Sequence, residues 1–287
     1  MRFGIIGCPI GHSLSPTLHE YLLQKIGVKG CYQAFEIQPE SLREAVSALK
    51  TLGFDGFNVT IPHKQTVMAH LDEVSEEAVR VGAVNTVCRR QNRWVGYNTD
   101  GAGFLRALQN NGVEVRNQSA VVLGAGGAAR AVIFALIDES IGRLRVINRT
   151  LERAEKLVNE VCAKTSFTNI GFAGSSGKAA AGVIQSASLL VNATSVGTWP
   201  EADSTPLAFD SDLKNVTVVD LVYNPVETRF LRAARELGAA TVDGLEMLIF
   251  QGIEAMRIWT EMHFDHTDFF KELKALLTQE LRSYGQH

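Results

Sequence analysis

The sequence of 287 residues predicts an α/β protein with two lobes, the second of them a doubly wound parallel sheet. Three observations predict this class. Short β-branched or aromatic runs alternate with longer amphipathic stretches along most of the chain. A glycine-rich turn at 124–130 follows one buried run and opens a helical stretch. After Asp243 the pattern is helical to the end, so we expect these last helices to return to the first lobe.

The first hundred residues carry alternating strand and helix signals. Runs of β-branched and aromatic residues predict strands at 3–6, 32–37, 57–61, 83–87 and 94–97. Amphipathic patterns predict helices at 16–26, 41–52 and 75–81, and a helix at 101–110 that leaves this region. Ser15 before Pro16 has the residue types of an N-cap followed by the first helical position. Asp100 could likewise cap the helix that starts at 101.

A second series of strands and helices follows. It predicts parallel strands at 120–123, 145–147, 188–192, 216–220 and 239–242 with helices between them, the layout of an open, doubly wound sheet. Asp243 is a good N-cap for the first of two tail helices. We therefore expect one domain at 1–100, completed by 244–287, and a second at 101–243.

Composition excludes several classes of protein. The net charge of −3 and the pI of about 6.2 argue against a nucleic-acid-binding surface, which needs a basic face. The sequence has neither a membrane-spanning apolar run nor the features of a signal peptide, so we expect a cytoplasmic protein. The scattered cysteines predict reduced thiols and no metal site. His263 and His266 flank Asp265 but lack a further ligand nearby, and we interpret them as surface residues.

The glycine-rich turn has the pattern GxGxxA between a buried strand and a helix. Gly124 permits the tight turn, Gly126 lets the backbone approach a pyrophosphate, and Ala129 allows close helix–strand packing. The helix N-terminus supplies N–H groups to the phosphates. An ordinary tight turn is the alternative, and the strand before and helix after argue against it. The predicted dinucleotide contacts are Gly124, Ala125, Gly126, Gly127 and Ala128.

The end of the next strand indicates which dinucleotide binds. NAD-selective sites place an Asp or Glu there for the ribose 2′-hydroxyl. Here the strand ends in Asn148, Arg149 and Thr150, and Arg153 follows one helical turn later. Two guanidinium groups attract a 2′-phosphate and can bind it bidentately. Solvated surface charges are the alternative, but cations are unfavourable at a helix N-terminus, so the sequence predicts NADP.

Seven polar segments, in order and at matching spacing over nearly the whole chain, resemble those of the shikimate dehydrogenase family. They are GHSLSP (11–16), NVTIPHK (58–64), GAVNT (82–86), NTDG (98–101), NATS (192–195), DLVYNP (220–225) and GLEMLIFQG (244–252). The resemblance implies the reversible NADPH-dependent reduction of 3-dehydroshikimate to shikimate. The sequence departs from the family at 197–200, where GTWP stands in place of the common Gly-Met.

The resemblance also implies roles for individual residues. Ser13 and Ser15, helped by Tyr223, would bind the substrate carboxylate. The ring hydroxyls would be held by Thr60, Lys64, Asn85, Asp100 and Gln251, with Lys64 and Asp100 at the reacting oxygen. The family's cofactor contacts fall on residues 124–128 and on Asn148, Arg149, Thr150 and Arg153, and its lesser ones on Glu76, Leu221 and Gly244.

The residues themselves leave alternatives open. Ser15 could be a helix cap only, Asp100 another cap, and a lone lysine after a strand is usually a solvated charge. The combination of Lys64 and Asp100 favours chemistry, and a neighbouring carboxylate favours the charged lysine. A quinate or dual quinate/shikimate dehydrogenase is one rival, although the two serines fit the shikimate pattern. A regulator that binds metabolite and cofactor without turnover is another. The expected partner is a small-molecule substrate, and the chain would act as a monomer or homodimer.

Overall fold

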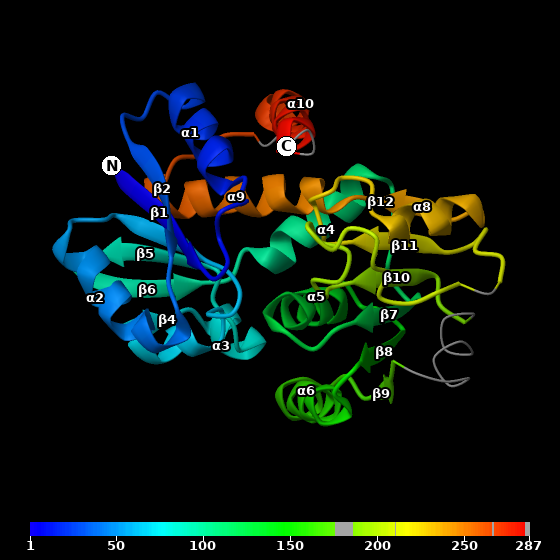
Figure 1. Ribbon diagram of the computed structural model, residues 1–287. Helices are drawn as coiled ribbons and strands as arrows, with labels where there is room; N and C mark the ends of the chain where they lie inside the picture. Colours follow the sequence, from blue (N-terminus) through cyan, green and yellow to red (C-terminus); the bar gives the residue numbers. More distant parts are fainter. Residues whose placement is uncertain (176–185, 210, 266, 285–287) are drawn as a thin grey trace. The chain divides into compact units, whose positions relative to one another are not determined.

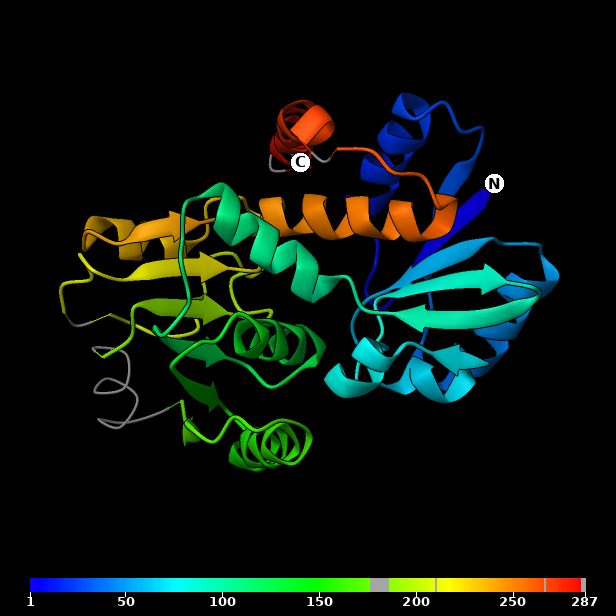
Figure 2. The same cartoon turned by 180° about the vertical axis from the view of Figure 1, so that it is seen from behind.

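The computed structural model describes residues 1–175, 186–209, 211–265 and 267–284 (Figures 1 and 2). The chain divides into two compact units. The first consists of Met1–Gly103 and Ile249–His287, and the second of Phe104–Leu248. Helices α4 (Asp100–Asn110) and α9 (Gly244–Thr260) each contribute residues to both units.

The first unit is built on a six-stranded mixed sheet in the order β2-β1-β3-β5-β6-β4. Strands β1, β2 and β3 are parallel, whereas β5 is antiparallel to β3 and to β6. Its elements before α4 are β1 (Arg2–Gly7), α1 (Ser15–Lys25), β2 (Cys31–Glu36), η1 (Pro39–Ser41), α2 (Leu42–Thr51), β3 (Gly56–Val59), η2 (Thr66–His70), β4 (Glu73–Val74), α3 (Glu76–Val81), β5 (Thr86–Arg90) and β6 (Arg93–Tyr97).

Strand β5 begins three residues later than the sequence predicts. The prediction rested on the apolar run at 83–87, but the hydrogen-bonded pairing of β5 with β6 extends to the pair Arg90–Arg93. Between them Gln91 and Asn92 both have positive φ values, 47° and 65°. Two left-handed residues match the twist of a tight hairpin, so this turn carries the pairing out to the two arginines.

The last two helices return to the first unit, as predicted. The ring of Trp259 on α9 stacks on Phe3 of β1 with the centroids 4.5 Å apart, and its Nε1 donates to the Val87 carbonyl oxygen at 2.9 Å. Helix α10 (Thr267–Tyr284) contacts α1 through Glu272, which accepts from the Tyr21 hydroxyl and pairs with Lys25, both at 2.6 Å.

The second unit contains a six-stranded sheet whose pairs are all parallel, in the order β12-β11-β10-β7-β8-β9. When β7 is counted as strand 1 and the sheet is read from β9 to β12, the strand order is 3-2-1-4-5-6. This is the order of dinucleotide-binding folds, which confirms the predicted fold class. Helices α5 and α6 lie on the same side of the sheet in both views (Figures 1 and 2). Its elements after α4 are β7 (Ser119–Leu123), α5 (Gly127–Asp138), β8 (Arg143–Asn148), α6 (Leu151–Lys164), β9 (Ile170–Gly174), β10 (Leu189–Asn192), β11 (Thr217–Asp220), α8 (Arg229–Glu236) and β12 (Ala240–Val242).

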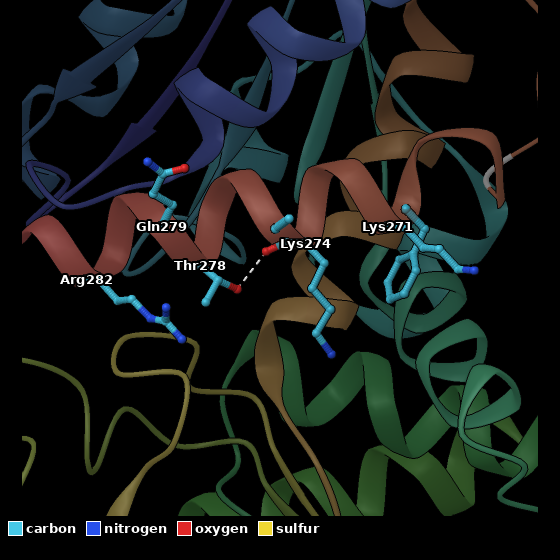
Figure 3. Close-up of a pocket in the computed structure, with 7 residues that line it drawn as sticks. Lys271, Lys274, Thr278, Gln279 and Arg282 are labelled. Atoms are coloured by element: carbon cyan, nitrogen blue, oxygen red, sulfur yellow. Dashed lines mark hydrogen bonds between the residues drawn. The ribbon is translucent and has the colours of Figure 1, made fainter.

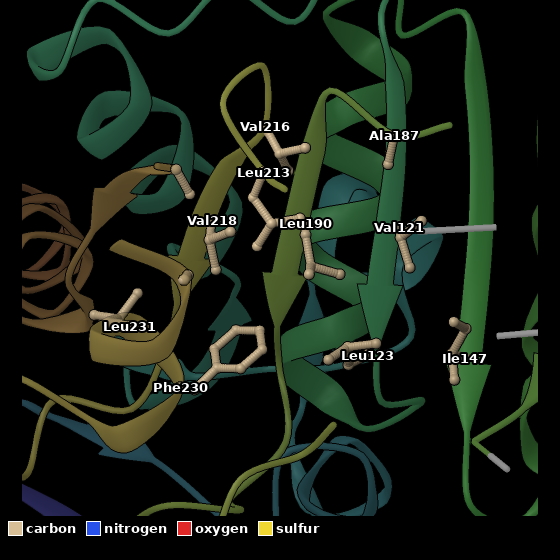
Figure 4. Close-up of a cluster of buried hydrophobic side chains, with 12 residues drawn as sticks. Val121, Leu123, Ile147, Ala187, Leu190, Leu213, Val216, Val218, Phe230 and Leu231 are labelled. Carbon is tan, nitrogen blue, oxygen red and sulfur yellow. The ribbon is translucent and has the colours of Figure 1, made fainter. Parts of the chain in front are cut away.

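Branched aliphatic side chains on alternate strand positions form the core of the second unit. Val121 and Leu123 of β7 lie beside Leu190 of β10 and Val218 of β11, with Phe230 of α8 packed against them (Figure 4). Strands buried on both faces have near-continuous apolar runs, and these runs predicted them.

Two helix starts test the predicted caps. The Asp243 carboxylate accepts from the N–H groups of Leu245 and Glu246, at 3.1 and 3.3 Å, so the predicted cap is confirmed. The prediction for Ser15 was wrong. Ser15 is already the first residue of α1, Leu14 occupies the cap position, and the Ser13 hydroxyl accepts from the Ser15 N–H at 3.3 Å.

No helix within the described ranges has the length and apolar composition needed to cross a membrane.

His19 of α1 is fully buried between two aromatic rings. It stacks on Tyr32 with a centroid distance of 4.4 Å and lies 5.0 Å from Trp259. Burial lowers the pKa of His19 to about 3, although the Asn58 side chain opposes the shift. The unfolded chain therefore binds a proton there more readily than the folded protein does. The stability that His19 contributes is complete above about pH 6.5 and falls as the pH drops toward 3.

His19→Phe, which keeps a ring but cannot titrate, tests this. Between about pH 7.5 and about pH 5, the free energy of unfolding of the unchanged protein should fall by about 2 kcal/mol more than that of the variant. Urea denaturation at both pH values measures the difference, and the value near pH 7.5 corrects for any change in packing. An equal loss in both proteins would contradict the neutral, buried histidine.

Candidate active site

The substrate residues that the sequence predicts in the first unit gather at one edge of its sheet. Thr60 and Lys64 follow β3, Asp100 follows β6, and Asn85 precedes β5, which runs in the opposite direction. The turn that holds Ser13 follows β1, which is parallel to β3. Because parallel strands end at the same edge and an antiparallel strand begins there, the topology alone brings these segments together.

Lys64 and Asp100 form an ion pair in this cluster. The Lys64 Nζ lies 2.5 Å from the Asp100 Oδ2, and the two side chains are only 15% and 5% exposed. This low exposure decides against the alternative of a solvated surface lysine. Asp100 is the first residue of α4, and its other oxygen accepts from Asn85, so both oxygens serve side-chain contacts.

Asn85 joins the ion pair to Gln251 of α9. Its Nδ2 donates to the Asp100 Oδ1 at 2.8 Å and to the Gln251 Oε1 at 3.3 Å. Asn85 and Gln251 are both buried. The structure thus connects Lys64, Asp100, Asn85 and Gln251 through side-chain contacts, four of the residues that the resemblance singled out.

The two serines and Thr60 lie at the end of β1. The Thr60 N–H donates to the Ile6 carbonyl oxygen at 3.0 Å, and the Ser13 N–H donates to that of Ile10, also at 3.0 Å. Ser13 and Thr60 are half-buried, and Ser15 is buried in the first turn of α1. The hydroxyl of Ser13 thus lies at a helix N-terminus, where the backbone dipole favours an anion.

The glycine-rich turn in the second unit has the geometry of a phosphate cradle. Gly124 has φ +110°, a conformation that favours glycine, and a Cβ there would lie 3.0 Å from the Ala193 carbonyl oxygen. A Cβ at Gly126, the cap residue of α5, would meet no described atom within 4 Å, so this side of the turn is open. The residues from 124 to 128 therefore fit a pyrophosphate at the N-terminus of α5.

The predicted 2′-phosphate residues lie beside this turn. Strand β8 pairs with β7, and the Gly124 N–H donates to the Ile147 carbonyl oxygen at 2.8 Å, one residue before Asn148. The Asn148 Nδ2 donates to the Thr150 carbonyl oxygen at 2.7 Å, which shapes the turn into α6. Arg149 and Arg153 are exposed, and in the part of the chain that the structure describes neither forms an ion pair. Both cations are therefore available to an anionic ligand.

Four predicted residues lie outside the segments described so far, namely Leu221, Tyr223, Gly244 and Glu76. Leu221 and Gly244 are in contact, since a Cβ on Gly244 would lie 2.6 Å from the Leu221 carbonyl oxygen. Tyr223 is half-buried in the same loop after β11. Glu76 is the exposed first residue of α3 in the first unit.

A buried carboxylate that the sequence analysis did not single out links the end of β10 to the loop between β11 and α8. Asp220 ends β11 and accepts from the Thr228 hydroxyl, the Val222 N–H and the Asn192 Nδ2 at 2.7 to 3.0 Å. Burial raises the pKa of Asp220 to about 6, against the opposing effect of these three donors. The NATS and DLVYNP segments that contain Asn192 and Asp220 were the only sequence signal.

Other features of the surface lack this chemistry. Within the described ranges, no group of three or more acidic, histidine or cysteine side chains could hold a metal ion. His263 is exposed, and His266 lies outside the described residues. A surface hollow on α10, lined by Lys271, Lys274 and Arg282 among others, contains none of the predicted site residues (Figure 3).

The comparisons with known proteins agree with this geometry. The family described as "Shikimate dehydrogenase substrate binding domain" matches residues 5–87, and "Shikimate / quinate 5-dehydrogenase" matches residues 106–206. The shikimate dehydrogenase (NADP(+)) of Symbiobacterium thermophilum is 44% identical over 257 residues, which cover 89% of this chain and 87% of the relative.

Solved structures are similar over nearly the full length. Shikimate 5-dehydrogenase from Thermus thermophilus, in complex with NADP(H) and shikimate, has a TM-score of 0.83 and 38% identity, covering 96% of this chain and 99% of that one. A quinate dehydrogenase from Corynebacterium glutamicum, in complex with NAD, has a TM-score of 0.84 and 32% identity with the same coverage. The buried Lys64–Asp100 pair and the parallel nucleotide-binding sheet agree with these matches, and the matches show that the chain belongs to the shikimate dehydrogenase family.

Proposed function

We propose that this protein catalyses the reversible, NADPH-dependent reduction of 3-dehydroshikimate to shikimate, a step toward chorismate and the aromatic amino acids. The observation that carries the proposal is the buried Lys64–Asp100 pair, joined through Asn85 to Gln251. In this proposal residues 1–100 and 244–287 bind the substrate and residues 101–243 bind NADP. The protein would work in the cytoplasm as a monomer or homodimer.

The second unit would hold NADP. The N-terminus of α5 would bind the pyrophosphate through the backbone of residues 124–128. The exposed Arg149 and Arg153, with Asn148 and Thr150, would bind the 2′-phosphate, and Glu76, Leu221 and Gly244 would make further contacts. When bound, the nicotinamide supplies or accepts the hydride.

The substrate would be held at its carboxylate and at its ring hydroxyls. Ser13 and Ser15 would donate to its carboxylate, and Tyr223 would assist. Thr60, Lys64, Asn85, Asp100 and Gln251 would contact the ring hydroxyls. A set of donors and acceptors fixed by their own hydrogen bonds orients a substrate without reorganising during the reaction.

Lys64 would move the proton at the reacting oxygen. During reduction negative charge develops on that oxygen, and the Lys64 ammonium stabilises it and donates a proton. The Asp100 Oδ2 lies 2.5 Å from the Lys64 Nζ and would hold the lysine side chain at that oxygen. Oxidation of shikimate releases a proton, so a higher pH assists that direction.

A spectrophotometric assay of NADPH formation tests the proposal. Shikimate with NADP should give turnover, and quinate should give much less because its additional hydroxyl lies on the carboxylate-bearing carbon, beside Ser13 and Ser15. Preferential turnover of quinate would favour the quinate dehydrogenase instead. Binding of both ligands without turnover would identify a regulator.

Arg149→Asp should weaken the binding of NADP much more than that of NAD. The loss of a charge-assisted contact and the added repulsion should weaken NADP by roughly 2–4 kcal/mol relative to NAD. The kcat/KM values for the two cofactors measure this. Arg143→Asp, at the opposite end of β8, is the matched control and should keep the preference. If Arg149→Asp still prefers NADP, the 2′-phosphate binds elsewhere.

Replacing Ser13 and Ser15 together with alanine should raise the KM for shikimate. Each lost hydroxyl costs about 1 kcal/mol, so the pair should cost about 2 kcal/mol, or roughly thirtyfold in affinity. The KM for NADP should change little. The exposed pair Ser41 and Ser47, replaced in the same way, is the control. An unchanged shikimate KM would mean that the two serines do not bind the substrate and only shape the start of α1.

Lys64→Ala should lower kcat by about 10²–10⁴, the usual contribution of a proton carrier, while the substrate KM changes a few-fold. Lys64→Arg should rescue poorly because guanidinium does not release its proton. Lys50→Ala breaks the more exposed Lys50–Asp72 pair of the same unit and should keep full activity. Circular dichroism checks the fold of each variant. A large rise in KM with kcat intact would make Lys64 a binding residue and not the proton carrier.

A further inference from the structure

Hydrogen-bonded side chains continue from Asn85 into the interior of the first unit, away from Lys64. The Thr86 hydroxyl donates to the Asn85 Oδ1 at 3.0 Å. The Asn58 Nδ2 donates to the Thr86 hydroxyl at 3.1 Å, and the Tyr32 hydroxyl donates to the Asn58 Oδ1 at 2.7 Å. Tyr32, Asn58 and Thr86 come from three different strands and are buried, and Asn85 is buried as well. We refer to Tyr32, Asn58, Thr86, Asn85 and Asp100 as the buried network.

The orientation of Asn85 in the network follows from a backbone contact. Its Oδ1 accepts from the Thr99 N–H at 2.8 Å, and a backbone N–H can only donate. The amide is therefore fixed with its Nδ2 toward Asp100, to which it donates at 2.8 Å. A flipped Asn85 would turn its oxygen toward the carboxylate and break both bonds.

The orientation of Asn58 follows in the same way. Its Nδ2 donates to the carbonyl oxygen of Asn85 at 3.1 Å, and a carbonyl can only accept. The Asn58 Oδ1 is thus free to accept from Tyr32, while its Nδ2 also donates to Thr86. The Thr86 hydroxyl accepts that bond and donates to the Asn85 Oδ1 at 3.0 Å, and the Thr99 hydroxyl lies 3.3 Å from the Thr86 hydroxyl. The donors from Tyr32 to Asn85 therefore form one unbroken line that ends on Asp100.

The far end of the network is closed by uncharged groups. His19 stacks on the Tyr32 ring, and burial keeps this histidine neutral by lowering its pKa to about 3. On the same face Trp259 of α9 donates to the Val87 carbonyl oxygen. Burying polar side chains on a sheet face costs more free energy than burying apolar ones. A buried network whose members are all hydrogen-bonded and that ends on Asp100, the partner of Lys64, therefore indicates a function beyond packing.

We propose that Tyr32, Asn58 and Thr86 are positioning residues that hold the Asn85 amide, and through it the Asp100 carboxylate, in the geometry that pairs with Lys64. The inference rests on the proposed function, because it assigns these residues to the same reaction. They need not touch the substrate. A chain of donors aligned in one direction stabilises the ionised carboxylate at its end, and preorganised side chains act without rearranging during the reaction.

Two substitutions at Thr86 separate positioning from packing. Thr86→Val keeps the shape and removes the hydroxyl, and it should lower kcat about five- to twentyfold while the KM for NADPH stays unchanged. Thr86→Ser removes a methyl group and keeps the hydroxyl, so it should restore most of kcat even though its melting temperature falls. Thr278→Val, which breaks a hydrogen bond to the Lys274 carbonyl oxygen on α10, is the matched control (Figure 3).

Tyr32→Phe tests the far end and replaces the Thr86 series if Thr86→Val does not fold. It should lower kcat two- to fivefold by removing one hydrogen bond of about 0.5–1 kcal/mol, converted at 1.36 kcal/mol per tenfold. Its control is Tyr21→Phe, which loses a surface bond to Glu272. Full kcat in Thr86→Val or Tyr32→Phe, or equal impairment of Thr86→Val and Thr86→Ser, overturns the inference. Absence of turnover in the unchanged protein overturns the proposed function, and the inference with it.

Discussion

The burial of the Asp100 carboxylate is the constraint on which the arrangement of the first unit depends. A carboxylate whose side chain is only 5% exposed has lost most of its water, and hydrogen-bond donors and a cation must replace it. Lys64 supplies the cation and Asn85 a donor, and they come from segments at the ends of different strands. Strands β3 and β5 must therefore keep the register that sets Asn58 opposite Thr86, because a slip of one residue would turn these side chains to the other face.

The second unit buries a carboxylate by different means. Among the described residues, the partners of Asp220 are neutral donors, from Asn192 of β10, the loop after β11 and the cap residue Thr228 of α8. With no cation beside it, burial raises the pKa of Asp220 to about 6. The folded protein therefore holds this proton more readily than the unfolded chain, so the contribution of Asp220 to stability is largest at low pH and falls as the pH rises through about 6. Asp220 thus joins the loop in which Leu221 and Tyr223 lie to the end of β10 and the start of α8.

Local patterns predicted the parts of this protein that local chemistry determines. Buried runs and the glycine-rich turn predicted the parallel sheet, and Asp243 predicted the start of α9. The short strands β4 and β9 were missed, because two residues and a Gly-rich edge carry little periodicity. Lys64 and Asp100 stood out through a family resemblance, whereas their contact depends on strand order. Thr86 stands in the GAVNT segment but received no role, because a threonine in a strand has the pattern of an ordinary β-branched position.

The two halves of the proposed reaction depend on side chains in opposite environments. Arg149 and Arg153 are exposed, so their charges were never desolvated and their replacement leaves the packed interior intact. The side chains that hold Asp100 are buried, and removing one leaves an unsatisfied polar group in the core. In the proposed function, cofactor preference would therefore be set by groups that contribute little to folding. The geometry of the Lys64–Asp100 pair is set by groups on which the first unit also depends for its stability. We therefore expect that cofactor preference can change independently of the fold, whereas the geometry of this pair cannot.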